Sequence, residues 1–144
     1  MRKDQLKIGV RSEGTLRIED LLDAAVDTLA EVAPRRAAGF RREVEKSAKD
    51  GHEYGDEILE EISDAVNEHV PQFCYYGSLE GDGACIGVFF SEESMRESVY
   101  DGETWIDKCD GKKMPKDARY RAVISDHGNV SIYFRNGREI VSVV

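Results

Sequence analysis

Apolar residues recur every three or four positions in three stretches of the first seventy residues. This spacing predicts three amphipathic helices. The first covers 18–33, with Thr15 as its expected cap, and Pro34 separates it from the second helix over 35–49. The third covers 56–69. Each helix has one apolar side, so the three should pack on one another or on a sheet.

The pattern changes to short β-type runs after Pro71, with turn residues between them. A short helix is expected over 91–100, and a short edge strand near the start of the chain over 6–10. The other expected strands cover 73–77, 84–90, 103–107, 119–125, 130–135 and 138–144. The sequence therefore predicts a single α+β domain over residues 1–144. In it, N-terminal helices pack on an antiparallel sheet formed mainly by the C-terminal half.

Composition narrows the class of protein. The chain has 144 residues, of which 40% are hydrophobic and 34% charged, so we expect one core of its own under a strongly hydrated surface. No apolar run approaches the roughly 20 residues that span a bilayer, and the charged start shows no secretory signal. A cytoplasmic location is therefore expected. Three cysteines in no zinc spacing indicate reduced thiols, with no metal and no cofactor.

The formal net charge is −9. This charge argues against direct binding to nucleic acid or to an anionic membrane, because both need a positive surface. It is compatible with a basic partner protein.

The charges are segregated by element. Residues 18–33 and 51–70 carry acidic side chains and no Lys or Arg, whereas 35–49 carries six basic residues. One interpretation is a bundle in which the basic helix neutralises two acidic ones. The other is an acidic ridge for a basic partner, since spacings of three and four place side chains on one helix face. The candidate protein-binding residues are Glu57, Glu60, Glu61, Asp64 and Glu68.

Other candidate sites are weaker. The glycines of 81–83 and Gly87 resemble a phosphate loop, but no helix follows them, so they are interpreted as turn glycines. Cys85 with His127 would need a shared site that one sequence cannot place, and no catalytic residue is assigned. The aromatic residues Phe89, Phe90, Tyr100 and Trp105 are expected in the core, because no basic residues interleave with them.

Several stretches resemble small, mostly uncharacterised proteins of phages and prophages: Gly14–Leu21, Gly77–Ala84 with Ile86 and Gly87, Asp126–Val130 with Tyr133, and the ending Val141–Val144. The resemblance implies a mobile-element setting and therefore the cytoplasm of a bacterial host. It supplies no catalytic residue.

The leading hypothesis is a non-enzymatic phage accessory protein that binds and inhibits a basic host protein, such as an anti-CRISPR or other anti-defence inhibitor. The host target would itself bind nucleic acid. One alternative is a binder of a nucleotide signal, with phosphates held by the Arg and Lys residues of 35–49 and of the C-terminal strands. Another is a small hydrolase that uses Cys85 or His127. Open sheet edges would also allow a homodimer.

Overall fold

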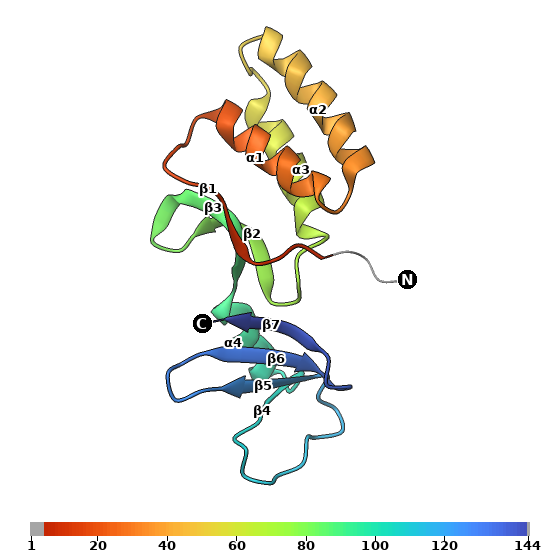
Figure 1. The fold of residues 1–144 in the computed structure, drawn as a ribbon, viewed down its shortest axis with the longest axis vertical. Coiled ribbons are helices and arrows are strands. Elements are labelled where there is room, and N and C mark those ends of the chain that lie inside the picture. The colour runs from red at the N-terminus through yellow and green to blue at the C-terminus, as the bar shows by residue number, and fades with distance from the viewer. Residues whose placement is uncertain (1–4, 144) are drawn as a thin grey trace. The chain divides into compact units, whose positions relative to one another are not determined.

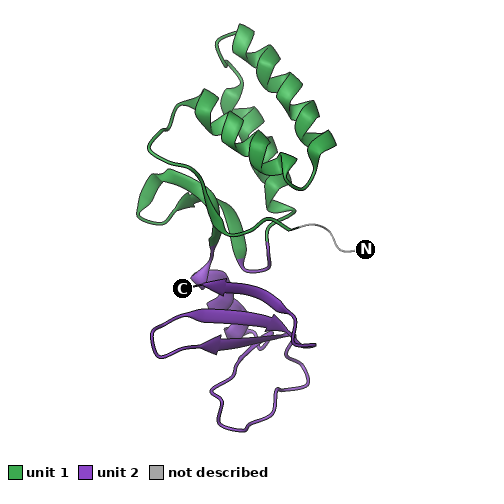
Figure 2. Ribbon diagram, viewed as in Figure 1, with its two compact units in different colours: residues 1–70, 74–89 green, residues 71–73, 90–144 purple. Residues whose placement is uncertain are grey.

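A computed structural model describes residues 5–143, which form two compact units. Unit 1 comprises 1–70 and 74–89, and unit 2 comprises 71–73 and 90–144 (Figure 2). Each unit is described by itself, and a single domain over the whole chain stays a prediction. Among the described residues, no helix is long and apolar enough to cross a membrane.

Unit 1 contains three helices, which follow its first strand in the chain (Figure 1). They are α1 (Ile18–Ala30), α2 (Pro34–Lys49) and α3 (Gly55–Asn67). Helix α1 contacts both α2 and α3, because its apolar stripe is wide enough to serve two neighbours. The centre of the core is formed by side chains with no exposed surface, among them Leu22, Leu29, Ile62 and Val66.

A three-stranded sheet completes unit 1, in the order β1-β3-β2. Its strands are β1 (Gly9–Ser12), β2 (Cys74–Leu79) and β3 (Asp82–Phe90), so two of the three come from the second half of the chain. Tyr76 and Val88 carry the sheet into the same core as the helices. Strand β1 runs antiparallel to β3, with Gly9 opposite Val88.

Unit 2 contains α4 (Glu92–Tyr100) and a second sheet in the order β4-β5-β6-β7. Its strands are β4 (Thr104–Ile106), β5 (Tyr120–Ile124), β6 (Val130–Phe134) and β7 (Glu139–Val143). Strands β5 to β7 form an antiparallel meander, whereas β4 pairs parallel to β5. Ala122, Ile132 and Val141 lie on the buried face of this sheet.

The predicted α+β class is confirmed, and helices α1 to α3 follow the periodicity. Strand pairing shows two features that the apolar pattern of the sequence did not predict. The strands form two sheets, and β4 pairs parallel to β5. The edge strand expected over 6–10 lies at Gly9–Ser12, while Leu6 is buried and its amide donates to the His69 carbonyl at 2.9 Å. The last predicted strand residue, Val144, lies outside the described residues.

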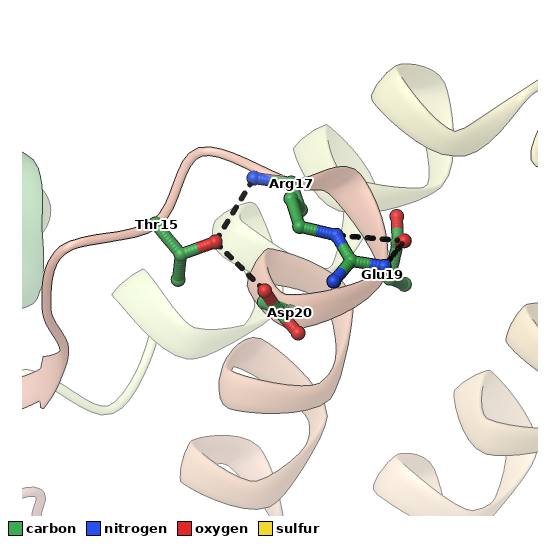
Figure 3. Close-up of polar contacts among 4 residues, drawn as sticks. All are labelled: Thr15, Arg17, Glu19 and Asp20. Carbon is green, nitrogen blue, oxygen red and sulfur yellow. Dashed lines mark hydrogen bonds and ion pairs between the residues drawn. The ribbon is translucent and has the colours of Figure 1, made fainter.

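The expected cap of α1 is corrected. Arg17, not Thr15, occupies the N-cap position, and its side chain makes no capping bond. The Thr15 hydroxyl instead accepts the Arg17 amide at 3.2 Å and donates to Asp20 Oδ2 at 2.7 Å (Figure 3). Thr15 thus orders the turn before the helix through local hydrogen bonds. Such bonds compete with the geometry in which the side chain would cap the helix.

Candidate functional site

Helix α3 is held in unit 1 by its apolar side. Ile62, Ala65 and Val66 are buried in the core shared with α1. The helix begins at Gly55, where an added Cβ would lie 2.6 Å from Ile18 Cγ1 of α1. Close approach at the first turn and burial along the helix together fix which side of α3 faces water.

The opposite side of α3 is a stripe of carboxylates. Glu57, Glu60, Glu61 and Asp64 are all exposed, and we call these four residues the acidic face. At about 100° per residue they fall within a stripe roughly 100° wide. Their spacings of three and four place like charges next to each other, which destabilises a helix.

Glu68, the fifth residue of the predicted ridge, differs from the other four. It lies at the C-cap of α3 and forms an ion pair with Arg36 of α2. Glu68 therefore helps to join two helices, whereas the acidic face has no ion pair or hydrogen bond from any side chain among residues 5–143.

The carboxylates of α1 show the contrast. Arg41 of α2 reaches Asp23 at 3.1 Å and Asp27 at 2.5 Å. Arg11 of β1 pairs with Glu31. Among the described residues, the predicted neutralisation by the basic helix therefore holds for Asp23 and Asp27 of α1 and for Glu68 at the end of α3. Glu31 is instead paired by β1.

The two remaining carboxylates of α1 lie in its first turn, and their partners are close to them in the sequence. Asp20 accepts from Thr15, and Glu19 pairs with Arg17 (Figure 3). A hydrogen bond from its own backbone amide, followed by the bond from Arg17, lowers the pKa of Glu19. Its own backbone amide and Arg17 thus keep Glu19 ionised at the positive end of the helix dipole.

The candidates for nucleophilic chemistry lie in separate units. Cys85 is buried in β3 of unit 1, and His127 is exposed in the β5–β6 turn of unit 2. Burial, with the nearby charges of Asp82 and Glu13, raises the pKa of the Cys85 thiol. A raised pKa lowers the fraction of thiolate at neutral pH, and thiolate is the nucleophile. Among the described residues, no three His, Cys, Asp or Glu side chains cluster to hold a metal.

The glycines once compared with a phosphate loop serve the backbone. Gly81 turns the β2–β3 hairpin with φ +84°, a conformation that favours glycine. Gly87 lies inside β3, where β1 passes too close for a side chain. The interpretation as a turn glycine is therefore confirmed for Gly81, whereas Gly87 and Gly83 lie inside β3, and an added Cβ at Gly83 would meet nothing within 4 Å.

The expectation for the aromatic residues needs correction. Tyr100 is 92% exposed and not in a core. Trp105 is half-buried, and the β4–β5 pairing sets it opposite Arg121, whose guanidinium lies 4.6 Å from the ring centroid of Tyr133. A basic residue therefore does interleave with aromatic ones, but through strand pairing, which the linear sequence does not display.

The sequence offered the basic residues of the C-terminal strands as candidate phosphate ligands, but it did not show that they gather with Lys116 in unit 2. Residues 116–119 and 134–138 enclose a hollow lined by Lys116, Arg119, Arg135 and Arg138. The signal in the sequence was the excess of eight basic over three acidic residues across 108–138, which the chain's net charge of −9 conceals.

No family model matches the sequence, and neither a curated protein nor a solved structure is significantly similar to it. The phage resemblance therefore rests on the short stretches quoted above, and the functional argument rests on the geometry of this chain.

Proposed function

We propose that this protein is a non-catalytic binding protein that docks a basic surface of a partner protein on the acidic face of α3. The observation that carries the proposal is the lack of any side-chain partner for Glu57, Glu60, Glu61 and Asp64 among the described residues, while each α1 carboxylate has one. Four exposed like charges on one helix face raise the free energy of the folded chain. A basic partner would offset that cost and associate faster through electrostatic steering.

The resemblance to phage and prophage proteins suggests the kind of partner. A host defence effector that binds nucleic acid, such as a CRISPR nuclease, presents a basic groove for the phosphate backbone. The acidic face would occupy that groove in place of phosphates. On this proposal the protein acts in the bacterial cytoplasm, without a cofactor, as an anti-defence inhibitor.

Capture from bacterial lysate at low salt tests the proposal with two variants of equal charge. The test variant carries Glu57→Gln, Glu60→Gln, Glu61→Gln and Asp64→Asn. The control carries Glu93→Gln, Glu97→Gln, Asp101→Asn and Glu103→Gln, which removes four exposed carboxylates from α4 and the turn after it.

Wild-type and control proteins should retain the same basic partner, and the test variant should lose it. Added duplex DNA should displace the partner, because both compete for one groove. Equal capture by test and control variants would show that net charge alone, and not the acidic face, retains the partner. Partner retention that DNA leaves unchanged would count against the nucleic-acid-binding groove.

A further inference from the structure

The hollow in unit 2 lies at one end of the second sheet. It has a volume of about 520 Å³ and is open to solvent between the loop before β5 and the β6–β7 turn. We call it the basic hollow, and it is lined by Lys116, Asp117, Arg119, Phe134, Arg135 and Arg138, with the smaller Ala118 and Asn136 between them.

Most of the charge that lines the basic hollow is positive, and within the described chain it is unpaired. Lys116, Arg119, Arg135 and Arg138 face one acidic residue, Asp117, and none of the four forms an ion pair within residues 5–143. Six other arginines of the described chain each pair with a carboxylate: Arg11, Arg17, Arg36, Arg41, Arg96 and Arg121. Four gathered cations with a single carboxylate among them repel one another, and a bound anion would relieve that repulsion.

Two of the guanidinium groups are already fixed in place. Arg135 Nη1 donates to the carbonyls of Pro115 at 2.8 Å and Ala118 at 2.7 Å, so it ties the loop to β6. The Arg138 guanidinium lies 4.5 Å from the ring centroid of Phe134. Stacking holds the plane of the group and leaves its N–H edge free for an oxygen ligand. Less side-chain entropy is then lost when a ligand binds.

We infer that the basic hollow binds a small ligand with adjacent phosphate groups, of the kind found in inorganic polyphosphate or the phosphate chain of a nucleotide. Planar guanidinium groups match the oxygens of phosphate in paired hydrogen bonds. One phosphate would leave the positive charge of the hollow only partly compensated, so two or more are expected. A long nucleic acid would have to lie against a chain of net charge −9, which favours a compact ligand.

This site is independent of the acidic face, because it shares no residue with α3. It also sharpens the earlier alternative of a nucleotide binder. The C-terminal basic residues line the basic hollow, whereas Arg35 and Arg42 of α2 are not among its lining residues.

Calorimetric titration of the full chain, without divalent cations, tests the inference with three probes. These are sodium tripolyphosphate, ATP and a single-stranded oligonucleotide at matched phosphate concentration. Saturable binding of tripolyphosphate and ATP, with amide NMR shifts confined to 116–119 and 134–138, supports the site. Equal affinity of the two shows that the phosphate chain suffices, and tighter ATP binding shows that the nucleoside adds contacts.

Matched variants locate the binding. Arg119→Gln and Arg138→Gln should each weaken tripolyphosphate binding about tenfold or more. Arg35→Gln and Arg42→Gln remove the same charge from α2 and should leave affinity unchanged. Arg119 is exposed, and its side chain makes no hydrogen bond to any of residues 5–143. Its variant should therefore fold, and unchanged fluorescence of Trp105 would verify this.

Three results would overturn the inference. The first is no saturable binding of tripolyphosphate or ATP up to about 1 mM. The second is equal weakening by the α2 variants. The third is an oligonucleotide that binds through 116–119 and 134–138 more tightly than either small probe, which would make the hollow a nucleic-acid site.

Discussion

Gly87 of β3 lies so close to Gly9 of β1 that an added Cβ would stand 2.3 Å from the Gly9 carbonyl oxygen. The next nearest atom, Val10 Cα, would be 2.9 Å away, and both belong to the backbone. A side chain at 87 would therefore have to move the strand itself. The pairing of β1 with β3 depends on this glycine.

Gly87→Ala should accordingly destabilise the folded chain by about 1–3 kcal/mol. Gly39 supplies the control: it lies within α2, and a Cβ there would meet nothing within 4 Å. Gly39→Ala should stabilise by about 0.5–1 kcal/mol, because alanine loses less entropy in a helix. Urea unfolding followed by far-UV circular dichroism measures both. Changes of the same sign would contradict the close-approach argument.

The like charges of the acidic face should lower the stability of the folded chain. Glu60→Gln, Glu61→Gln and Asp64→Asn together remove several like-charge contacts at spacings of three and four, each worth about 0.2–0.5 kcal/mol. We expect a combined gain of about 1 kcal/mol at low ionic strength, shrinking as salt screens the charges. Thermal unfolding at two salt concentrations measures it.

Asp23 and Asp27 of α1 serve as the comparison in that measurement, because removing paired carboxylates should lower stability. Both pair with Arg41, whose side chain is 36% exposed. Asp23→Asn with Asp27→Asn should destabilise by about 0.5–1 kcal/mol, the range for partly exposed ion pairs. If the two sets of variants shift stability equally, the distinction between partnered and unpartnered carboxylates fails.

Alkaline pH should weaken the fold through Tyr76. Burial raises the pKa of its phenol from 10.0 to about 12, against smaller opposing effects of Thr28 and Arg11. Below pH 10 the phenol is neutral in folded and unfolded chains alike. Between pH 10 and about 12 the unfolded chain loses this proton while the folded chain keeps it, so stability falls as pH rises.

Tyr76→Phe should remove this part of the pH dependence, at most about 2–3 kcal/mol for a two-unit shift. Tyr54, a residue that is 58% exposed, gives the matched control Tyr54→Phe. Urea unfolding across the alkaline range measures the slope. An unchanged slope in Tyr76→Phe would show that other groups account for it, such as Cys74, whose thiol has a pKa raised by burial to about 11.

Arg135 should order the loop before β5. Its two hydrogen bonds to the carbonyls of Pro115 and Ala118 are lost in Arg135→Ala, which should cost about 1 kcal/mol at this exposed position. Hydrogen exchange at Lys116, Asp117 and Ala118 should speed up. Arg135→Lys keeps the charge but replaces the planar guanidinium with an ammonium group, so its exchange rates should lie between those of the wild type and Arg135→Ala. Unchanged exchange in the alanine variant would show that the loop is ordered by other contacts.

The sequence by itself determined the local elements. The apolar period of 3.6 fixed α1, α2 and α3 to within a few residues, and the turn at Asn136-Gly137 marked the β6–β7 hairpin. The sequence also predicted that the residues of the acidic face lie next to one another, because residues three and four apart on a helix are neighbours whatever the rest of the chain does.

Tertiary structure alone decided the relationships between distant segments. Three of these relationships join residues far apart in the chain. Strand β1 pairs with β3, and β4 pairs parallel to β5. Lys116 and Arg119 line one hollow together with Arg135 and Arg138. Packing also decided that Glu68 pairs with Arg36, whereas the four carboxylates of the acidic face have no side-chain partner among the described residues. Periodicity records which side of an element is apolar. Which element covers that side, and which charge finds a partner, depends on packing that no single stretch of sequence contains.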